Sequence, residues 1–214
     1  MNASLKPKHQ MNRSLREAFE YRGCPICHLL DKDEFDSMAT LQYQTIHEEK
    51  VRQDLVSANG YCNFHFHQMA RLASAMGNAV LTKDLIDAEI KEIEKGSFEP
   101  TLRIDCPVCK HADEREKFYV REFGALLSEK SFQKEYEATD GLCRIHLKRV
   151  LNLLQGGELH QFVLASHMMH LRLLKVELET FISKVGSTQR DFKVEKNSWL
   201  VAIEKMAGKR GLKG

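Results

Sequence analysis

One stretch of the sequence decides how the chain is interpreted: Cys24-Pro25-Ile26-Cys27, followed after 34 intervening residues by Cys62-Asn63-Phe64-His65. A second copy, Cys106-Pro107-Val108-Cys109, is followed after 33 residues by Cys143-Arg144-Ile145-His146. Together the copies use all six cysteines of the chain. This repeated spacing indicates metal ligands, because the packing of a hydrophobic core does not require Cys and His at the same intervals twice.

The similarity between the two copies extends beyond the cysteines. Gly60 aligns with Gly141 ahead of the third Cys, and Glu34 aligns with Glu116 after each C-x2-C. The chain therefore contains an internal duplication with a period of about 80 residues. Duplicated units of this size usually pack against each other, because one alone buries too little apolar surface.

We expect each copy to hold one metal centre. Two thiolates at C-x2-C can fold around one cation, and a Cys and a His at i and i+3 share one face of a helix. The predicted ligands are Cys24, Cys27, Cys62 and His65 in the first copy and Cys106, Cys109, Cys143 and His146 in the second. Three Cys and one His make a closed tetrahedral set, which predicts two zinc ions. Two iron–sulfur clusters are the alternative, since thiolates suit both, and spacing does not separate them.

Two other interpretations of the C-x2-C segments find less support. Cys24-x-x-Cys27-His28 also spells a c-type haem attachment signature, but the second copy has Lys110 at the position of His28. A thioredoxin-like redox pair would need a preceding strand, and neither segment follows a strand-like run. We expect His28 to be a surface residue or to contact a ligand from outside.

Three further histidines lie outside the repeated set. His67 aligns with a lysine in the second copy. His167 and His170 are spaced i and i+3 on a later helix, but a pair without a carboxylate or thiolate partner is more often packed or solvated than metal-bound. We therefore expect no third site.

The composition is that of an ordinary globular protein. Of 214 residues, 43% are hydrophobic and 29% charged, and 32 Lys and Arg against 30 Asp and Glu give a net charge of +2. Such a balance argues against a dedicated nucleic-acid-binding protein. The sequence contains no apolar run near the ~18 residues of a membrane span. The first ten residues lack the apolar core of a secretory signal, so we expect a cytoplasmic protein.

Apolar residues recur at helical spacing throughout, and no segment alternates with period 2, so the sequence predicts an all-α helical bundle built from two tandem metal-stapled repeats. The expected helices cover 14–21, 28–46, 62–76, 80–93, 108–127, 132–138, 143–154, 158–185 and 198–206. We divide the chain into an N-terminal helix (1–23), a first Cys3His repeat (24–100), a second with a long helix (101–185), and a basic linker with a C-terminal amphipathic helix (186–214).

The C-terminal segment carries seven Lys and Arg against three Asp and Glu. Its last helix places Trp199, Leu200, Ile203 and Met206 on one side. We expect this side to pack onto the body of the protein. Docking onto a partner or a membrane surface is the alternative, because basic amphipathic helices do both.

Several motifs together resemble an uncharacterised bacterial family, a domain of unknown function with duplicated CPxC and GxCxxH motifs. They are Leu15-Arg-Glu-Ala-Phe19, Gly23-Cys-Pro-Ile-Cys27, Gly60-Tyr-Cys-Asn-Phe-His65 with its second copy, and Trp199-Leu-Val-Ala-Ile-Glu-Lys205. The resemblance spans nearly the whole chain and all eight ligand positions match. It implies a bacterial or archaeal cytoplasmic protein and brings no established activity.

From these features we expect a non-enzymatic scaffold that binds a protein partner. A closed ligand set leaves no coordination position for substrate, and the sequence has no Gly-rich phosphate loop, nucleophile elbow or kinase signature. An iron–sulfur protein that transfers electrons or senses redox state is the alternative. A nucleic-acid-binding zinc protein is the lesser alternative, which the near-neutral charge disfavours.

Overall fold

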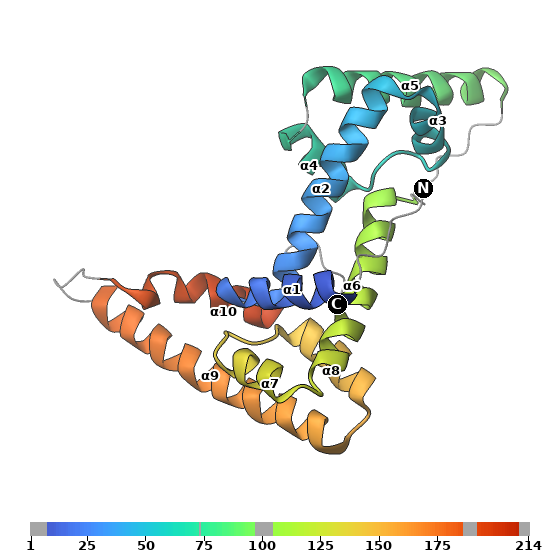
Figure 1. The fold of residues 1–214 in the computed structure, drawn as a ribbon. Helices are drawn as coiled ribbons and strands as arrows, with labels where there is room; N and C mark the ends of the chain where they lie inside the picture. The colour runs from blue at the N-terminus through green and yellow to red at the C-terminus, as the bar shows by residue number, and fades with distance from the viewer. Residues whose placement is uncertain (1–7, 73, 97–104, 186–191, 210–214) are drawn as a thin grey trace. The chain divides into compact units, whose positions relative to one another are not determined.

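The computed structural model describes the chain except for residues 1–7, 73, 97–104, 186–191 and 210–214. In the described part, ten α-helices and two short 3-10 helices form and no strand is present (Figure 1). The predicted all-α class is confirmed. No helix of the described part is both long and apolar enough to cross a membrane.

The chain divides into two compact units that do not follow the order of the sequence. The first unit combines residues 1–30 with 116–214, and the second is residues 31–115. Both boundaries fall inside long helices, α2 (Pro25–His47) and α6 (Pro107–Leu126). The second unit is thus inserted between the two parts of the first. The four segments expected from the sequence stay a prediction.

The first unit surrounds an aromatic core. It contains α1 (Lys8–Glu17), η1 (Ala18–Glu20), α7 (Lys130–Glu137), α8 (Arg144–Leu154), α9 (Gly157–Val185), η2 (Val194–Asn197) and α10 (Ser198–Ala207), with the start of α2 and the end of α6. The rings of Phe132 and Tyr136 meet that of Phe123 edge-on, at centroid distances of 5.4 and 5.2 Å. Edge-to-face pairs of this kind stabilise a core beyond the area they bury. Helix α9 contacts α8 and α10.

The second unit has a smaller core. It contains the rest of α2, then α3 (Glu49–Ser57), α4 (Asn63–Leu72), α5 (Ala75–Glu94) and the start of α6. Helix α5 contacts α3 and α4. The buried apolar side chains are Met38, Val51, Leu55, Tyr61, Met69, Leu81 and Val108, together with Cys106.

Some helix boundaries differ from those expected. Helix α1 begins at Lys8, before the expected start at residue 14. The predicted gap between the helices 62–76 and 80–93 is wrong: α5 runs through it from Ala75, because the Ser74 hydroxyl caps the helix by accepting a hydrogen bond from the Gly77 amide at 3.1 Å. Of the predicted linker, 186–191 lies outside the described residues, and Val194–Asn197 form η2.

Candidate metal centres

The eight predicted ligand side chains gather into two groups of four, but not in the predicted combination. The Cys24 quartet consists of Cys24, Cys27, Cys143 and His146, and the Cys62 quartet consists of Cys62, His65, Cys106 and Cys109. In each, the four donor atoms lie within 4.8 Å of one another. The predicted grouping by copy is wrong, because each quartet joins the C-x2-C of one copy to the C-x2-H of the other.

The length of α2 gives the physical reason for this exchange. The helix has 23 residues, and at 1.5 Å per residue it carries the chain about 35 Å from its start. The nine residues of α3 form a helix only about 14 Å long, which is too short to bring the chain back to the start of α2. The third Cys motif therefore lies beside the middle of α2 rather than at its start: His65 lies near Glu34, and Gln68 of α4 donates a hydrogen bond to that carboxylate at 2.9 Å.

The Cys24 quartet lies in the first unit and is fully enclosed. His146 Nδ1 lies 3.4 Å from the sulfurs of Cys24 and Cys27 and 3.3 Å from that of Cys143. The sulfurs of Cys27 and Cys143 are 3.7 Å apart. The exposed fraction is 3% or less for each of the four side chains. All four donors thus converge on one point that solvent does not reach.

The Cys62 quartet lies in the second unit and repeats this geometry. His65 Nδ1 lies 3.1 Å from the sulfur of Cys62 and 3.4 Å from those of Cys106 and Cys109. The sulfurs of Cys62 and Cys109 are 3.6 Å apart. Cys106 and His65 are buried, whereas Cys62 and Cys109 are half-buried. The two quartets therefore match in spacing and differ in access.

Helix starts bring the cysteines into position. Pro25 and Pro107 open α2 and α6, and proline suits the first helical residue because its missing N–H would have no partner there. Cys143 is the N-cap of α8, and its sulfur accepts from the amide of His146 at 3.5 Å. Each quartet thus lies at two helix N-termini, whose partial positive charge favours thiolates.

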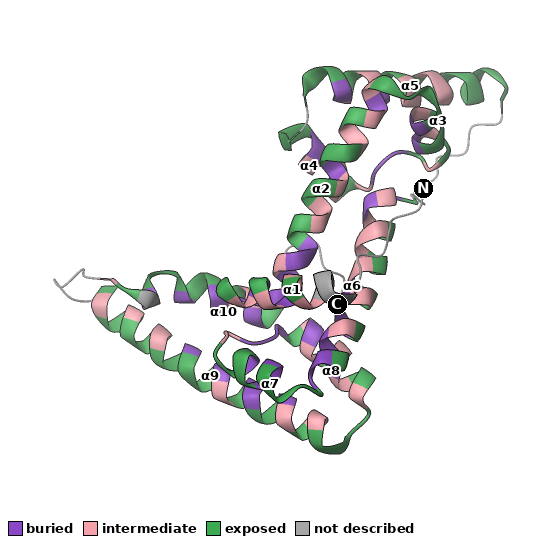
Figure 2. Ribbon diagram, viewed as in Figure 1, coloured by how far each residue is buried: buried purple, intermediate pink, exposed green. Residues whose placement is uncertain are grey.

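A glycine with positive φ leads into each C-x2-H helix. Gly60 and Gly141 have φ of 78° and 73°, a conformation that residues with a Cβ rarely adopt. Space is also absent: a Cβ on Gly141 would lie 2.1 Å from Nδ1 of His170. These approach loops are buried (Figure 2). The repeated Gly-x-Cys motif therefore has a backbone explanation that the sequence did not give.

A carboxylate lies behind the histidine of each quartet. Glu116 Oε1 lies 2.8 Å from Nε2 of His146, and the other oxygen pairs with Arg149. Glu34 Oε2 lies 3.8 Å from Nε2 of His65, and its other oxygen accepts from Gln68 at 2.9 Å. Because Nδ1 faces the sulfurs in both rings, each carboxylate faces the outer ring nitrogen, where it can orient a metal-ligating histidine. The comparison of the two sequence copies aligned these glutamates but assigned them no role. Their occurrence at the same place in both copies was the signal that could have identified them.

The protonation balance of the Cys62 quartet reflects its crowded donors. Burial alone would lower the pKa of His65, but the hydrogen bond with Cys106 and the nearby Glu34 carboxylate outweigh it and raise that pKa to about 10. Burial raises the pKa of Cys109 to about 12, with the charge of Cys106 adding to it. For Cys106, burial is outweighed by the hydrogen bond with His65, and its pKa falls to about 6. A divalent cation would take the place of the protons that these groups share.

The Cys24 quartet shows the same pattern. Burial works to lower the pKa of His146, yet the charge of Cys24 and hydrogen bonds with Cys143 and Cys24 raise it to about 10. The hydrogen bond with Cys143 raises the pKa of Cys27, and the bond with Cys24 lowers that of Cys143. Mixed thiol and thiolate sulfurs at this spacing are typical of a ligand set that can give up its protons to an ion.

The other histidines lie outside both quartets. His28 stacks on Tyr21, with ring centroids 3.9 Å apart. His67 is exposed. His167 and His170 are buried, and Nε2 of His170 lies 3.2 Å from the carbonyl of Glu137. Burial, followed by the charge of Lys205, lowers the pKa of His167 to about 4, which keeps that ring neutral.

The C-terminal helix α10 does not pack as expected. Its buried residues are Ser198, Val201 and Lys205, whereas Trp199 is 45% exposed and Ile203 57% exposed. The expected packing of the Trp199 face on the body is therefore wrong. Polar anchors explain the reversal, because they turn the opposite side of the helix toward the protein.

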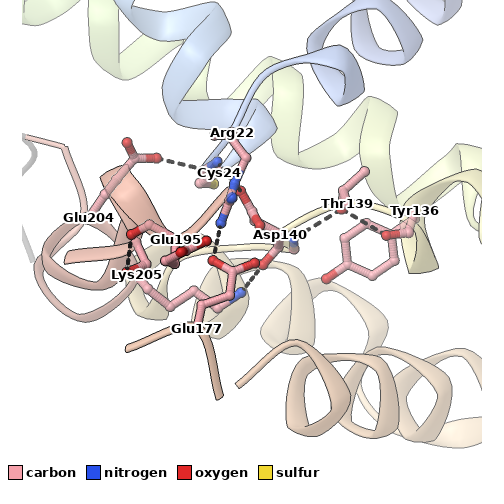
Figure 3. A network of polar contacts seen from close by, with 12 residues as sticks. Arg22, Cys24, Tyr136, Thr139, Asp140, Glu177, Glu195, Glu204 and Lys205 are labelled. Carbon is pink, nitrogen blue, oxygen red and sulfur yellow. Dashed lines mark hydrogen bonds and ion pairs between the residues drawn. The ribbon is translucent and has the colours of Figure 1, made fainter. Parts of the chain in front are cut away.

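These anchors form the network drawn in Figure 3. Glu204 accepts a hydrogen bond from the Cys24 amide at 2.7 Å, and the Lys205 ammonium donates to the carbonyl of Asp140. Asp140 also accepts from Arg22 at 2.7 Å, and Arg22 pairs with Glu177 at 2.7 Å. Helix α10 is thus fixed beside the Cys24 quartet through a backbone amide of one of its members.

Comparisons with known proteins found a similarity for part of the chain only. Residues 11–104 match the family model described as a family of unknown function, DUF6062. This match is shorter than the expected resemblance: it covers less than half of the chain and contains Cys24, Cys27, Cys62 and His65, the motifs of the first copy. Searches of curated proteins and of solved structures each found no match. The first copy is therefore similar to a family whose description carries no activity.

Proposed function

We propose that the protein is a non-enzymatic helical scaffold, held together by two closed Cys3His zinc sites, that serves as an interaction adaptor for another protein. The observation that carries the proposal is the pair of quartets, each with four donor atoms within 4.8 Å. The proposed ligands are Cys24, Cys27, Cys143 and His146 for one ion and Cys62, His65, Cys106 and Cys109 for the other.

The donor spacing fits one ion in each quartet. Zinc–sulfur bonds of 2.3 Å and zinc–nitrogen bonds near 2.0 Å put tetrahedral sulfurs about 3.8 Å apart and sulfur and nitrogen about 3.5 Å apart. The observed sulfur pairs are 3.6 and 3.7 Å apart. The four ligands of an iron–sulfur cluster are distributed over two or four irons, so they do not all lie this close to one another. The spacing therefore favours single zinc ions over the iron–sulfur alternative.

A closed site suits a structural role. Three thiolates and one imidazole fill the coordination sphere of zinc, whereas catalytic zinc keeps one position for water or substrate. Each ion would also join segments far apart in the sequence, since 116 residues separate Cys27 from Cys143. Metal binding then becomes folding free energy for two small cores. All six cysteines are free, as suits the reducing cytoplasm that we propose as its location.

The adaptor role follows from the outer face of α10. Trp199, Leu200 and Ile203 are 45%, 49% and 57% exposed. Exposed apolar side chains that gather on one helix face are typical of protein interaction sites. With the basic balance of residues 186–214, this face suits an acidic amphipathic segment of a partner protein.

Metal analysis tests the scaffold. Protein purified without added metal should be colourless and carry two zinc ions per chain by inductively coupled plasma mass spectrometry. A brown preparation under anaerobic conditions, with absorption near ~400 nm and stoichiometric iron and sulfide, would refute the zinc sites and support iron–sulfur clusters. A chain that folds normally with neither metal would refute both.

A photo-crosslinking residue at position 199 tests the adaptor role. We expect one discrete protein adduct in cells, which disappears when Leu200 and Ile203 are changed to Ser. The same crosslinker at position 161, an exposed site on α9, is the matched control. Equal labelling from both positions would contradict a specific docking face.

A further inference from the structure

The two quartets contain one equivalent pair of sulfurs each. Cys62 and Cys109 are 3.6 Å apart, and their counterparts by motif, Cys143 and Cys27, are 3.7 Å apart. Each pair joins the cysteine of C-x2-H to the second cysteine of C-x2-C. The pairs have the same chemistry and the same spacing, so each serves as an internal reference for the other.

The pairs differ in access to solvent. Cys27 and Cys143 are 1% and 0% exposed. Cys62 and Cys109 are half-buried, although they belong to a quartet with the same ligand types. Solvent therefore reaches the two residues of one pair and not those of the other.

Neighbouring residues explain this difference. In the Cys24 quartet, residues 23–27 are all buried, Glu204 of α10 bonds the Cys24 amide, and His28 stacks on Tyr21. In the Cys62 quartet, the flanking Asp105 and Lys110 are exposed. The residues around the C-x2-C segment therefore enclose the Cys24 quartet, whereas the corresponding residues of the Cys62 quartet are exposed to solvent.

We propose that the Cys62–Cys109 pair is an oxidation site for hydroperoxides, whose conversion to a disulfide releases the zinc ion of the Cys62 quartet while the Cys24 quartet keeps its own. This inference rests on the proposed zinc function. It assigns the two quartets different roles: the enclosed one holds the first unit together permanently, and the open one makes the order of the second unit depend on the thiol redox state.

The chemistry balances with the hydroperoxide as the only oxidant. One thiolate attacks the terminal peroxide oxygen, so that an S–O bond forms, the O–O bond breaks, and the alkoxide or hydroxide leaves. The second thiolate attacks the resulting sulfenic acid, so that the S–S bond forms and hydroxide leaves. Two protons from solvent give an alcohol or water and a second water. The two sulfurs lose two electrons, and zinc retains only His65 and Cys106 of its four ligands.

The experiment uses the full zinc-loaded chain, hydrogen peroxide as the probe and a pyridylazoresorcinol indicator for released zinc. We expect one zinc ion per chain to be released and one retained. Thiol alkylation in denaturant, followed by peptide mass spectrometry, should find a disulfide between Cys62 and Cys109 and alkylated Cys24, Cys27 and Cys143. Release of both ions at one rate, release of none, or a disulfide in the Cys24 quartet would overturn the proposal.

A matched pair of variants separates access from metal affinity. Cys109→His keeps a zinc donor but removes one sulfur of the open pair, and its zinc release should slow at least tenfold. Cys27→His makes the same change in the enclosed pair and should leave the release from the Cys62 quartet unchanged. If a variant does not fold, the disulfide map of the unaltered chain decides alone. A chain that binds no zinc refutes the proposed function, whereas two bound ions without selective release refute only this inference.

Discussion

Paired serine substitutions test which side chains share an ion. If Cys24 and Cys143 bind the same zinc, each single change to Ser removes that ion, and the double variant removes nothing more. Zinc per chain should fall from two to one in both single variants and remain at one in C24S/C143S. By contrast, C24S/C62S takes one ligand from each quartet and should retain no zinc.

The size of the effect follows from the closure of the sites. Structural zinc sites in small peptides contribute about 10–16 kcal/mol of apparent binding free energy. The free energy lost with one ion is therefore as large as the whole free energy of unfolding of most domains. Because the two quartets lie in separate compact units, C24S should lower the helical signal of one unit and C62S that of the other. The free-energy changes should add for C24S/C62S and fail to add for C24S/C143S.

Zinc by plasma mass spectrometry and helicity by circular dichroism measure both effects on the same sample. His28→Ser is the control, because His28 follows Cys27 directly and belongs to neither quartet; it should retain two zinc ions. The opposite result, one zinc in C24S/C62S and none in C24S/C143S, would refute the exchanged grouping and restore the grouping by sequence copy.

Three further changes probe the surroundings of the Cys24 quartet. Glu116→Gln keeps the shape of the side chain but removes the charge behind His146, and competition with a chelator should show zinc affinity at this quartet lowered about 10–100-fold. If affinity is unchanged, Glu116 only balances Arg149. Gly141→Ala places a methyl group against His170 in a left-handed conformation and should lower the free energy of unfolding by more than about 1 kcal/mol in urea titrations; equal stability would show that the loop relaxes. His167→Leu should flatten the loss of stability between pH 6.5 and 4, because the folded-state pKa of His167 is lowered to about 4 and the unfolded chain binds the proton first in that range. The stability of the variant relative to the unaltered protein should then rise as the pH falls from 6.5 to 4 and stay constant above pH 7, and parallel curves from urea titration would contradict this.

The sequence was sufficient for the helical class and for the eight side chains that gather in the quartets. Helical spacing of apolar residues and repeated Cys and His intervals are local signals, which do not depend on how the helices pack. The grouping was not local. The grouping depends on the length of α2 relative to α3 and on which C-x2-C segment lies beside the first residues of α4 and of α8. Tertiary packing decides both.

The C-terminal helix shows a second limit. Its apolar stripe predicted burial of Trp199, because apolar area usually faces a core. The structure buries Lys205 instead, whose ammonium reaches the Asp140 carbonyl. Polar anchors between residues far apart in sequence have no periodic signature, so a single sequence does not reveal them. The duplicated Glu34 and Glu116 were visible, but only the approach of each to a histidine ring gave them a role.

The insertion of residues 31–115 between the two parts of the first unit sets an order of events on the ribosome. A nascent chain completes the donor set of the inserted unit when Cys109 emerges, while Cys24 and Cys27, made much earlier, still wait for Cys143 and His146. During that interval these two thiols lack their partners, and the first unit is complete only after residues 116–214 have been synthesised. Translation that stops between residues 109 and 143 would therefore yield a second unit with all four of its donors, together with a Cys24–Cys27 dithiol that lacks its two partner residues.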